Sequence, residues 1–461
     1  MLSYTMGEDG FLMRKYFDRI HFTSFQIIIM GFSLVILIGS LLLMLPFARA
    51  GAGCASFGEA LFTATSAVCV TGLVVQDTAT YWSGFGQAVI LALIQIGGMG
   101  VVTAAVAVAM VSGRKISLMQ RSTMQEAIAA HHVGGIVKLT GFILKTTLII
   151  ELTGTVLLSA VFAKDFGPVK GAWYGLFHSV SAFCNAGFDL MGAREPFSSL
   201  TGYADRTLVN VVVMALIIVG GVGFLTWEDV KSNRWHFRAY RMQSKVILST
   251  TGILLVFPAL FFYFGEFARP EWSDMAGGER LLGALFQSVT PRTAGFNTVD
   301  LTRMSEVGRF LIIVLMLIGG SPGSTAGGMK TTTLAVLFYS AMSVFKRRET
   351  IRCFGRRIEI EAVRSAATIL VLYLVLFLAG GLAISWIEDL PVLTGLFEAA
   401  SAIGTVGLTL GITPQLCGAS RVILIGLMFF GRVGGLTLIF AAASGKRPYA
   451  ARLPKEKITV G

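Results

Sequence analysis

The chain has 461 residues, of which 54% are hydrophobic and only 14% are charged, and its formal net charge is +12. Because a soluble domain carries about 25% charged residues, this composition leaves no soluble domain of useful size and indicates a polytopic membrane protein. The five cysteines have neither metal-binding nor redox spacing, so they are interpreted as small buried residues. No cleavable signal is expected, since residues 1–22 are polar and the first apolar run is too long for one.

Apolar segments of about 20 residues, the length that crosses a bilayer as a helix, predict eight spans. These lie near 25–46, 84–112, 139–163, 207–226, 246–265, 310–345, 365–387 and 418–442. Eight spans put both termini on one side of the membrane. The segments on that side hold 24 Lys and Arg against 10 Asp and Glu, whereas the opposite loops hold 10 against 14. The positive-inside rule therefore predicts that both termini are cytoplasmic. The basic surface is expected to face anionic membrane lipid and a cytoplasmic partner, and the placement of the charge argues against nucleic acid as a partner.

Four short stretches between paired spans resemble one another. They read "LFTATSAVCVTGLVV" from Leu61, "LFHSVSAFCNAGFDL" from Leu176, "LFQSVTPRTAGFNTV" from Leu285 and "LFEAASAIGTVGLTL" from Leu396. Each opens with Leu-Phe and reaches a Gly that precedes a hydrophobic residue, although the third stretch is one residue shorter. These glycines are Gly72, Gly187, Gly295 and Gly407. The stretches are too short to cross a bilayer, and irregular backbone at membrane depth survives only where it lines water or is buried in protein.

The repeat predicts an all-α integral membrane fold of four tandem span–pore-loop–span units. Eight transmembrane helices and four re-entrant pore helices are expected in a pseudo-fourfold arrangement around one pore. The expected segments are a cytoplasmic N-terminus (1–24), repeat 1 (25–112), a linker (113–138), repeat 2 (139–226), a linker (227–245), repeat 3 (246–345), a linker (346–364), repeat 4 (365–442) and a cytoplasmic tail (443–461).

The four Gly-centred loops predict a filter that binds K⁺ through backbone carbonyls, as K⁺ channels do. Aiming successive carbonyls at one axis needs backbone angles that Gly tolerates. "TVG" at 405–407 equals the start of the TVGYG signature of K⁺ channels, whereas the other loops read "VTG", "NAG" and "TAG", so about one good site is expected. Ordinary small-residue packing is the alternative interpretation. The candidate filter residues are Val70, Thr71, Gly72, Asn185, Ala186, Gly187, Thr293, Ala294, Gly295, Thr405, Val406 and Gly407, with K⁺ at the four glycines.

The stretch "GGSPGSTAGGMKTTT" (319–333) resembles a phosphate-binding P-loop, but Met precedes its Lys and its flanks are apolar. The segment 310–345 would be roughly 54 Å long as one helix, nearly twice a hydrocarbon core of about 30 Å. We therefore expect an intramembrane loop that interrupts this span beneath the filter, with a purely structural kink as the alternative interpretation. The family resemblance described below implies that this loop is a gate. The candidate gate residues are Gly319, Gly320, Ser321, Pro322, Gly323, Ser324, Thr325, Ala326, Gly327, Gly328, Lys330 and Arg432.

Charged residues in the apolar segments receive separate predictions. Arg432 lies inside the last span, where an arginine is costly unless it faces a cavity or a partner. It is expected to face the pore near the gating loop and to repel K⁺ or to hold the loop's carbonyls, with packing between helices as the alternative. Arg292 and Glu398, in the third and fourth pore segments, are expected to form a buried pair. Asp77, Asp189 and Asp300 follow filter loops and either concentrate cations or are ordinary solvated loop charges.

With "AVCVTGL", "AFCNAGFD", "TPRTAGFNT" and "AIGTVGLT" in a fourfold plan, nearly the whole chain resembles the Trk/Ktr/HKT superfamily of potassium transporters. Eight spans, "GGSPGSTAGGMKTT" and a short tail resemble most the KtrB-like membrane subunits of this superfamily. The resemblance implies K⁺ permeation, often stimulated by Na⁺, through a homodimer with one pore per subunit in the bacterial plasma membrane. It also implies a cytoplasmic ring of KtrA-like RCK subunits that bind ATP or ADP and move the gate. Gly at position 72, rather than Ser, matches the K⁺-permeable form.

The leading prediction is therefore the ion-translocating subunit of a potassium uptake system, with no enzyme activity and no covalent cofactor. Three alternatives remain open. One is a Na⁺ or non-selective cation channel of the same fold that needs no ring. Another is a membrane enzyme acting on a phosphorylated substrate through 319–333, which would need a Mg²⁺-binding set of carboxylates that the cytoplasmic loops lack. The third is a secondary transporter with moving halves.

Overall fold

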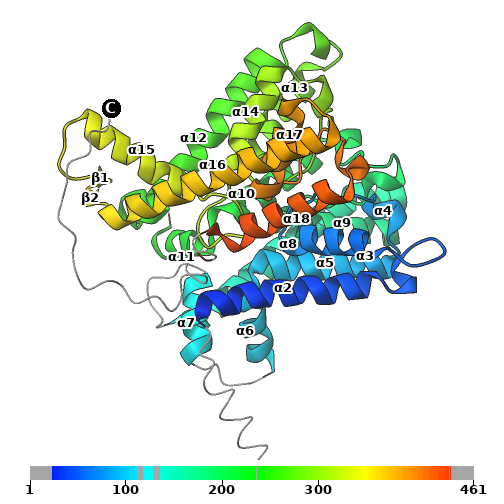
Figure 1. Cartoon of the computed structure of the whole chain (residues 1–461), viewed down its shortest axis with the longest axis horizontal. Coiled ribbons are helices and arrows are strands. Elements are labelled where there is room, and N and C mark those ends of the chain that lie inside the picture. The colour runs from blue at the N-terminus through cyan, green and yellow to red at the C-terminus, as the bar shows by residue number, and fades with distance from the viewer. Residues whose placement is uncertain (1–22, 113–117, 128–134, 235, 436, 438–461) are drawn as a thin grey trace, which may run out of the picture.

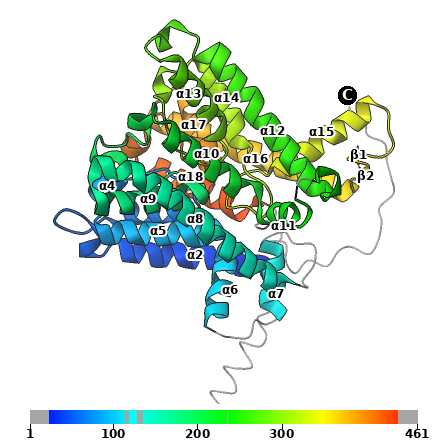
Figure 2. The same ribbon diagram turned by 180° about the vertical axis from the view of Figure 1, so that it is seen from behind.

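The computed structural model describes residues 23–112, 118–127, 135–234, 236–435 and 437. Within these residues the regular structure is almost wholly helical, with one two-stranded hairpin. Figure 1 shows long helices running side by side from one end of the molecule to the other, with α16, α18 and α2 on the near side. Figure 2 shows α12, α9 and α8 on the opposite side. The predicted tail, 443–461, and most of the N-terminus, 1–24, lie outside the described residues.

The helices follow the predicted order of span, pore helix and span. Repeat 1 contains α2 (Ser24–Leu43), α3 (Phe57–Val68), α4 (Thr78–Tyr81), α5 (Gly84–Met99) and α6 (Val101–Val111), followed by α7 (Leu118–Ala127). Repeat 2 contains α8 (Ile136–Phe166), α9 (Pro168–Phe183), α10 (Thr207–Val222) and α11 (Phe224–Asn233). Repeat 3 contains α12 (Met242–Phe261), α13 (Gly277–Val289), α14 (Glu306–Leu317) and α15 (Thr331–Phe345). The linker after it holds β1 (Arg352–Cys353) and β2 (Arg356–Arg357). Repeat 4 contains α16 (Ile360–Glu388), α17 (Val392–Gly404) and α18 (Gly418–Val433).

The first long helix of every repeat is continuous. These helices are α2, α8, α12 with its π-helical extension to Glu266, and α16, and each has the length and apolar composition to cross a bilayer alone. The second long helix of each repeat is interrupted instead. The pairs α5–α6 and α10–α11 bend by 99° and 95°, and α14 has only 12 residues before its loop begins.

Glycine at equivalent positions causes these interruptions. "GGMG" (97–100), "GGVG" (220–223) and "GRVG" (431–434) each end on a Gly with positive φ, namely +84° at Gly100, +99° at Gly223 and +91° at Gly434. Such an angle cannot continue a right-handed helix and is disfavoured for any residue with a Cβ. The predicted spans 84–112 and 207–226 are therefore bent pairs of helices rather than single continuous ones, and α18 ends at Val433 within the predicted span 418–442.

The four pore helices occupy the centre of the molecule. On α3, α9, α13 and α17 the buried positions gather toward the C-terminal end, where each helix reaches its Gly-centred loop. Buried hydrophobic side chains from all four repeats form one continuous core around them. The predicted all-α fold of repeated span–pore-loop–span units is thus confirmed, and the loops that carry the candidate filter meet in the interior.

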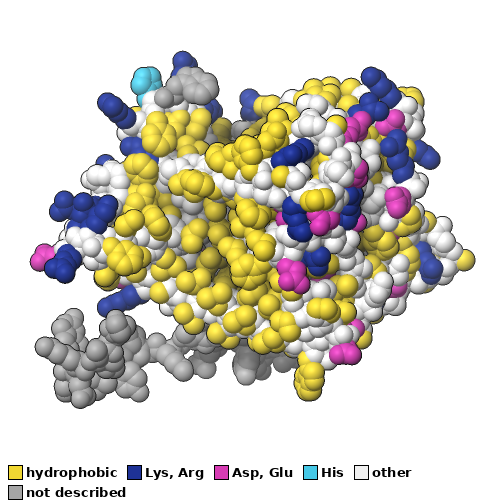
Figure 3. All heavy atoms as spheres, turned by 90° about the horizontal axis from the view of Figure 1, so that it is seen from above, with side chains coloured by type: hydrophobic (Ala, Val, Ile, Leu, Met, Phe, Trp, Pro, Cys, Tyr) yellow, Lys and Arg dark blue, Asp and Glu magenta, His cyan; other side chains and the backbone are white. Residues whose placement is uncertain are grey.

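The surface separates into a hydrophobic band and two charged ends (Figure 3). We call one end, where α2 begins and α15 ends, the basic end, because Lys and Arg outnumber acidic side chains there. The other, the mixed-charge end, carries both signs, and every ion pair within the described residues lies there. The band between the ends has the apolar surface that a bilayer would cover.

Candidate ion filter and gate

The four key glycines lie against one another's loops in a closed ring. A Cβ placed on any of them would lie closer than 3.0 Å to a backbone carbonyl oxygen of the next loop. The pairs are Gly72 with Ala186, Gly187 with Ala294, Gly295 with Val406, and Gly407 with Thr71. The sequence of contacts runs from repeat 1 through repeats 2, 3 and 4 and back to repeat 1. A side chain at any of these positions would push two loops apart.

The filter loops share one unusual backbone pattern. In each loop the key Gly and the residue two positions before it both have positive φ, and the residue between them supplies the carbonyl just described. The first members are Val70 (+50°), Asn185 (+56°), Thr293 (+63°) and Thr405 (+51°), and the glycines lie between +70° and +95°. Positive φ is uncommon for residues other than Gly and persists only where the surroundings enforce it. When the residues on both sides of a middle residue have a left-handed backbone conformation, successive carbonyls can point to the same side of the loop. A filter lined by carbonyls needs this arrangement.

Hydroxyl groups that the sequence reasoning missed support these loops. Each repeat has a buried Ser or Thr at the end of its pore helix, namely Ser66, Ser181, Thr290 and Ser401. Their backbone carbonyls accept the N–H of the middle filter residue at 2.8–3.0 Å. The Oγ atoms of Ser66 and Ser401 accept the N–H of the key Gly at 3.1 and 3.0 Å. The other two hydroxyls donate instead to the carbonyls of Phe188 and Phe296, both at 2.7 Å.

This difference divides the ring into two pairs of adjacent loops, one from repeats 1 and 4 and one from repeats 2 and 3. The position of these supporting hydroxyl residues could have been recognised in the sequence. The hydroxyl residue lies six positions before the Gly in three repeats, and five positions before it in the shortened third repeat.

The ring offers oxygen atoms and no carboxylate cluster. All the candidate filter residues are buried. The hydroxyl oxygens of Thr71, Thr293 and Thr405 are buried and have no hydrogen-bond partner within the described residues. Nor does this part of the chain contain a group of three or more His, Cys, Asp or Glu side chains able to hold a metal ion. A cation in the ring would therefore be bound by carbonyl and hydroxyl oxygens, which suits an alkali ion in transit.

Hydrogen bonds join the two ends of the predicted gating loop to each other. It joins α14 to α15 and is buried except at 322–324 and at Lys330, which are partly exposed. The N–H of Gly319 donates to the carbonyl of Met329 at 2.7 Å, and the Nζ of Lys330 donates to the carbonyl of Ala326 at 2.8 Å. The Oγ of Ser321 and the Oγ1 of Thr331 lie 3.2 Å apart where the two ends of the loop meet. The lysine that gives the stretch its P-loop likeness is thus engaged by the loop's own carbonyls.

One side of the gating loop is attached to repeat 2. The N–H of Ser321 donates to the carbonyl of Gly221 at 3.0 Å, and the N–H of Phe224 donates to the carbonyl of Gly323 at 2.7 Å. These bonds use the peptide groups that the interruption between α10 and α11 leaves free. The hydroxyl of Thr325 reaches further, because its Oγ1 lies 2.9 Å from the side-chain Oδ1 of Asn185 in the filter. The loop therefore contacts the candidate filter directly.

Arg432 attaches the other side of the gating loop to repeats 1 and 4. Its guanidinium donates to the carbonyl of Thr325 in the loop and to the carbonyls of Gly97 and Gly98, the latter at 3.1 Å. The N–H of Gly328 donates to the carbonyl of Gly431 at 3.1 Å. Arg432 was predicted either to repel K⁺ or to hold the loop's carbonyls, and these direct contacts support the second action. Toward the basic end, a cavity of about 350 Å³ is lined by both Lys330 and Arg432.

The predicted buried pair of Arg292 and Glu398 is wrong. Glu398 is fully buried and accepts hydrogen bonds from the hydroxyls of Thr409 and Thr413 and from the N–H of Leu410. The guanidinium of Arg292 instead donates to the hydroxyl of Thr251 on α12 at 3.3 Å, and no ion pair joins it to Glu398 within the described residues. The two side chains serve different neighbours because local hydroxyls and backbone groups satisfy the carboxylate.

The acidic residues that follow the filter loops have backbone partners. Asp77 accepts the N–H groups of Ala79 and Thr80 at the start of α4, and also that of Phe197 in repeat 2 at 3.0 Å. Asp189 accepts the N–H of Met191 at 2.9 Å, and Asp300 accepts a similar local N–H. These contacts favour a structural role over free charges that attract cations.

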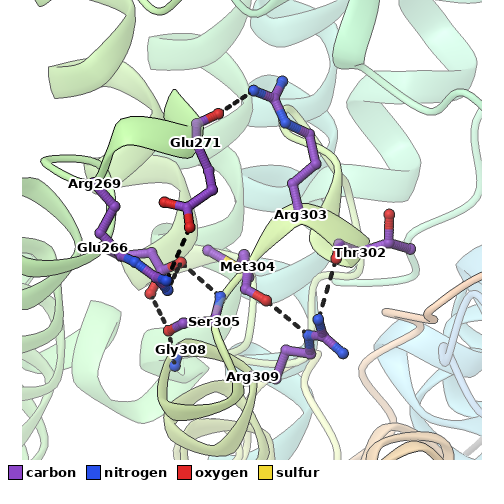
Figure 4. Close-up of polar contacts among 9 residues, drawn as sticks. All are labelled: Glu266, Arg269, Glu271, Thr302, Arg303, Met304, Ser305, Gly308 and Arg309. Atoms are coloured by element: carbon purple, nitrogen blue, oxygen red, sulfur yellow. Dashed lines mark hydrogen bonds and ion pairs between the residues drawn. The ribbon is translucent and has the colours of Figure 1, made fainter. Parts of the chain in front are cut away.

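A buried carboxylate fixes the helix that leads into the gating loop (Figure 4). Glu266, at the end of the α12 extension, accepts the N–H of Ser305 at 2.8 Å and its hydroxyl at 2.5 Å. Ser305 in turn caps α14 by accepting the N–H of Gly308 at 2.9 Å. Any Cβ at Gly308 would lie 2.6 Å from a carboxylate oxygen of Glu266. The mixed-charge end of α14 is thus anchored, and the sequence held no signal for this contact.

Comparisons with known proteins agree with this geometry. The family described as "TrkH: Cation transport protein" matches residues 10–447. The chain is 40% identical to the potassium/sodium uptake protein NtpJ of Enterococcus hirae, over 95% of the chain and 97% of that relative. It is 38% identical to the Ktr system potassium uptake protein B of Bacillus subtilis, over 93% of the chain and 95% of that relative. The crystal structure of the potassium transporter TrkH from Vibrio parahaemolyticus superposes with a TM-score of 0.72 at 20% identity, covering 92% of this chain and 85% of the other, which supports the fold.

Proposed function

Because the chain belongs to the TrkH family of cation transport proteins, we propose that it is the ion-translocating subunit of a potassium uptake system. The observation that carries this proposal is the closed ring of four Gly-centred loops. Each loop presents a carbonyl beside its neighbour's Gly, and the ring contains no carboxylate cluster within the described residues. Such a ring replaces the hydration shell of K⁺ with fixed oxygens.

Permeation is channel-like in this proposal, and the gating loop is the barrier. The loop's contacts with Asn185 and with Arg432 support a position directly on the basic side of the filter. Opening requires the loop to leave these partners. The peptide groups of the interrupted helices α10 and α18 provide the contacts that break and re-form.

Regulation comes from a separate cytoplasmic chain in this proposal. Relatives are named as components of Ktr systems, which supports a transporter of several components. A ring of KtrA-like RCK subunits that bind ATP or ADP would dock at the basic end of a homodimer and move the gating loop, and Na⁺ would act as an activator. The excess of Lys and Arg supports a cytoplasmic basic end, and so cytoplasmic termini, in the bacterial plasma membrane.

A cation channel that does not discriminate K⁺ from Na⁺ is the second candidate. The unequal hydroxyl support of the two halves of the ring favours it, because an asymmetric ring holds a single ion size less strictly. The name of the relative NtpJ, a potassium/sodium uptake protein, points the same way.

Growth of a bacterial strain that lacks its own K⁺ uptake systems tests the proposed function. Expression of the full chain, with its regulatory subunit supplied, should restore growth at low external K⁺. A chain that reaches the membrane in normal amount and leaves the strain dependent on high external K⁺ would contradict the proposal.

A further inference from the structure

A cavity of about 450 Å³ opens at the basic end, between the start of α12 and the β1–β2 hairpin. Its walls carry four basic side chains, Arg238, Arg241, Lys245 and Arg356, and no acidic one. We call it the basic pocket. It is separate from the filter and from the cavity beneath the gating loop, which have different linings.

No ion pair neutralises the basic side chains of the basic pocket within the described residues, although the carboxylate of Asp229 accepts the backbone N–H of Arg241 at 2.8 Å. The ion pairs found in residues 23–435, apart from the gaps in the description, all lie at the mixed-charge end. The Nζ of Lys245 donates one hydrogen bond, to the carbonyl of Arg238 at 2.7 Å. The three guanidinium groups have no hydrogen-bond partner among the described residues. Because like charges in one cavity repel, an anion that bridges them lowers the electrostatic energy.

The backbone adds to the attraction for an anion. Helix α12 begins at Met242, and its N-cap residue, Arg241, makes no side-chain capping hydrogen bond. Met242 and Gln243, the first two helical residues, line the basic pocket. The first N–H groups of a helix lack partners within the helix, and the helix dipole makes this end positive. Phosphate groups bind at such helix ends together with basic side chains.

The position of the pocket identifies the source of the phosphate. Helix α12 is one of the four continuous spans, so its first residues mark the boundary between membrane and water. Phe354 in the pocket wall is 42% exposed, and Phe237 beside it is 43% exposed, with ring centres 6.3 Å apart. Exposed aromatic rings at this level are typical of the membrane interface. The phosphate of a lipid in the adjacent leaflet lies at the same level, and anionic lipids are attracted to clustered Lys and Arg.

We propose that the basic pocket binds the phosphate group of an anionic phospholipid. The lipid bridges basic residues at the start of α12 to Arg356 on the hairpin. That hairpin packs on α15, since Ile351, Cys353 and Ile358 share a small core with Ala335 of α15. A neighbouring cavity also contacts Met242 and extends to Pro322 in the gating loop. The bound lipid therefore stabilises the position of the helix that follows the gating loop.

Native mass spectrometry of the full purified chain tests the proposal through lipid retention, which does not depend on transport. The probes are phosphatidylglycerol, which is anionic, and phosphatidylcholine, which has no net charge. The test variant is Arg241→Gln with Arg356→Gln, and the matched control is Arg352→Gln with Arg364→Gln. The control removes two exposed charges from the same end, one of them on the same hairpin, outside the pocket.

The unmodified chain should retain phosphatidylglycerol in preference to phosphatidylcholine, and the control should match it. The test variant should bind phosphatidylglycerol about thirtyfold more weakly, the effect expected for two basic residues at an anionic surface. Equal weakening in both variants would reduce the effect to the general charge of the basic end and overturn the proposal. Equal retention of the two lipids by the unmodified chain would also overturn it. Displacement of the lipid by millimolar inorganic phosphate would mean that the pocket takes free phosphate, which overturns the lipid assignment.

Discussion

Glycine at the four ring positions meets two separate demands, one from its own backbone and one from the neighbouring loop. A positive φ costs a residue with a Cβ about 1–2 kcal/mol. The neighbouring carbonyl adds a steric conflict that cannot be relieved without moving another filter loop. If backbone strain were the only cost, the protein would tolerate a side chain at these positions. Strain and the steric conflict together exclude one.

Gly407→Ala separates these demands. Its added methyl would contact the carbonyl of Thr71, so we expect K⁺ over Na⁺ discrimination to fall at least tenfold when ⁸⁶Rb⁺ uptake is measured with each ion as competitor. Gly411→Ala is the matched control, because Gly411 also has positive φ, +89°, but has open space at its Cβ position. The control should lose stability by about 1–2 kcal/mol and keep its selectivity. Equal loss of selectivity in both variants would assign the effect to strain rather than to the ring.

Arg432→Gln tests whether the guanidinium holds the gating loop closed. Hydrogen bonds to charged groups contribute about 1.5–3 kcal/mol each, and Arg432 makes three such bonds to Thr325, Gly97 and Gly98. We expect basal ⁸⁶Rb⁺ flux without the regulatory subunit to rise about tenfold or more. Arg421→Gln is the control, since Arg421 lies on the same helix but donates to Pro414 at the mixed-charge end. Reduced flux in Arg432→Gln would favour a role in packing between helices.

At the scale of the elements, the second helix of each repeat is where the sequence reasoning and the structure differ. The repeat of Leu-Phe and Gly predicted the pore loops because those residues recur at matched spacing. The bends at Gly100 and Gly223 were missed, because the length of an apolar segment predicts a span but does not reveal that one residue within it has a positive φ. The long Gly- and Pro-containing insertion in repeat 3 was found because it is too polar and too long for one helix.

The side-chain partners were less predictable than the elements. The candidate filter residues were predicted from local pattern, since each loop is set by residues within six positions of its Gly. Arg292 and Glu398 were paired in error, because their real partners come from α12 and from the segment after the fourth filter loop. The contact between Glu266 and Ser305 joins residues 39 positions apart that have no pattern in common.

Deletion of Ser321 to Gly328 tests the gating loop as an element. The deletion removes the contacts with Gly220, Gly221 and Asn185, so flux should rise and control by the regulatory subunit's nucleotide should weaken. Unchanged flux in a chain that still reaches the membrane would contradict the role of the loop.

Thr325→Val is a milder version of the same test, because it removes the hydroxyl that joins the loop to the filter at Asn185. Thr332→Val serves as its control, since Thr332 lies in the first turn of α15 rather than in the loop that precedes it, and makes no side-chain hydrogen bond within the described residues. We expect a smaller rise in flux for Thr325→Val than for the deletion, and none for the control.

For the whole molecule, the proposed function places the basic end on the cytoplasmic side of the membrane. Two exposed cysteines, Cys54 and Cys417, lie in loops at the mixed-charge end. A thiol reagent that does not cross membranes should therefore label both in intact cells, and Cys54→Ser with Cys417→Ser should abolish that labelling. Labelling that needs permeabilised cells would reverse the proposed orientation.

The central claim is that a ring completed by all four repeats conducts K⁺. The most direct measurement is ⁸⁶Rb⁺ uptake into liposomes that contain the purified chain with its regulatory subunit, with K⁺ and Na⁺ as competitors. We expect uptake that K⁺ suppresses at low concentration and that Na⁺ hardly affects. Equal suppression by the two ions would contradict K⁺ selectivity and leave the four glycines as the wall of a non-selective cation pore.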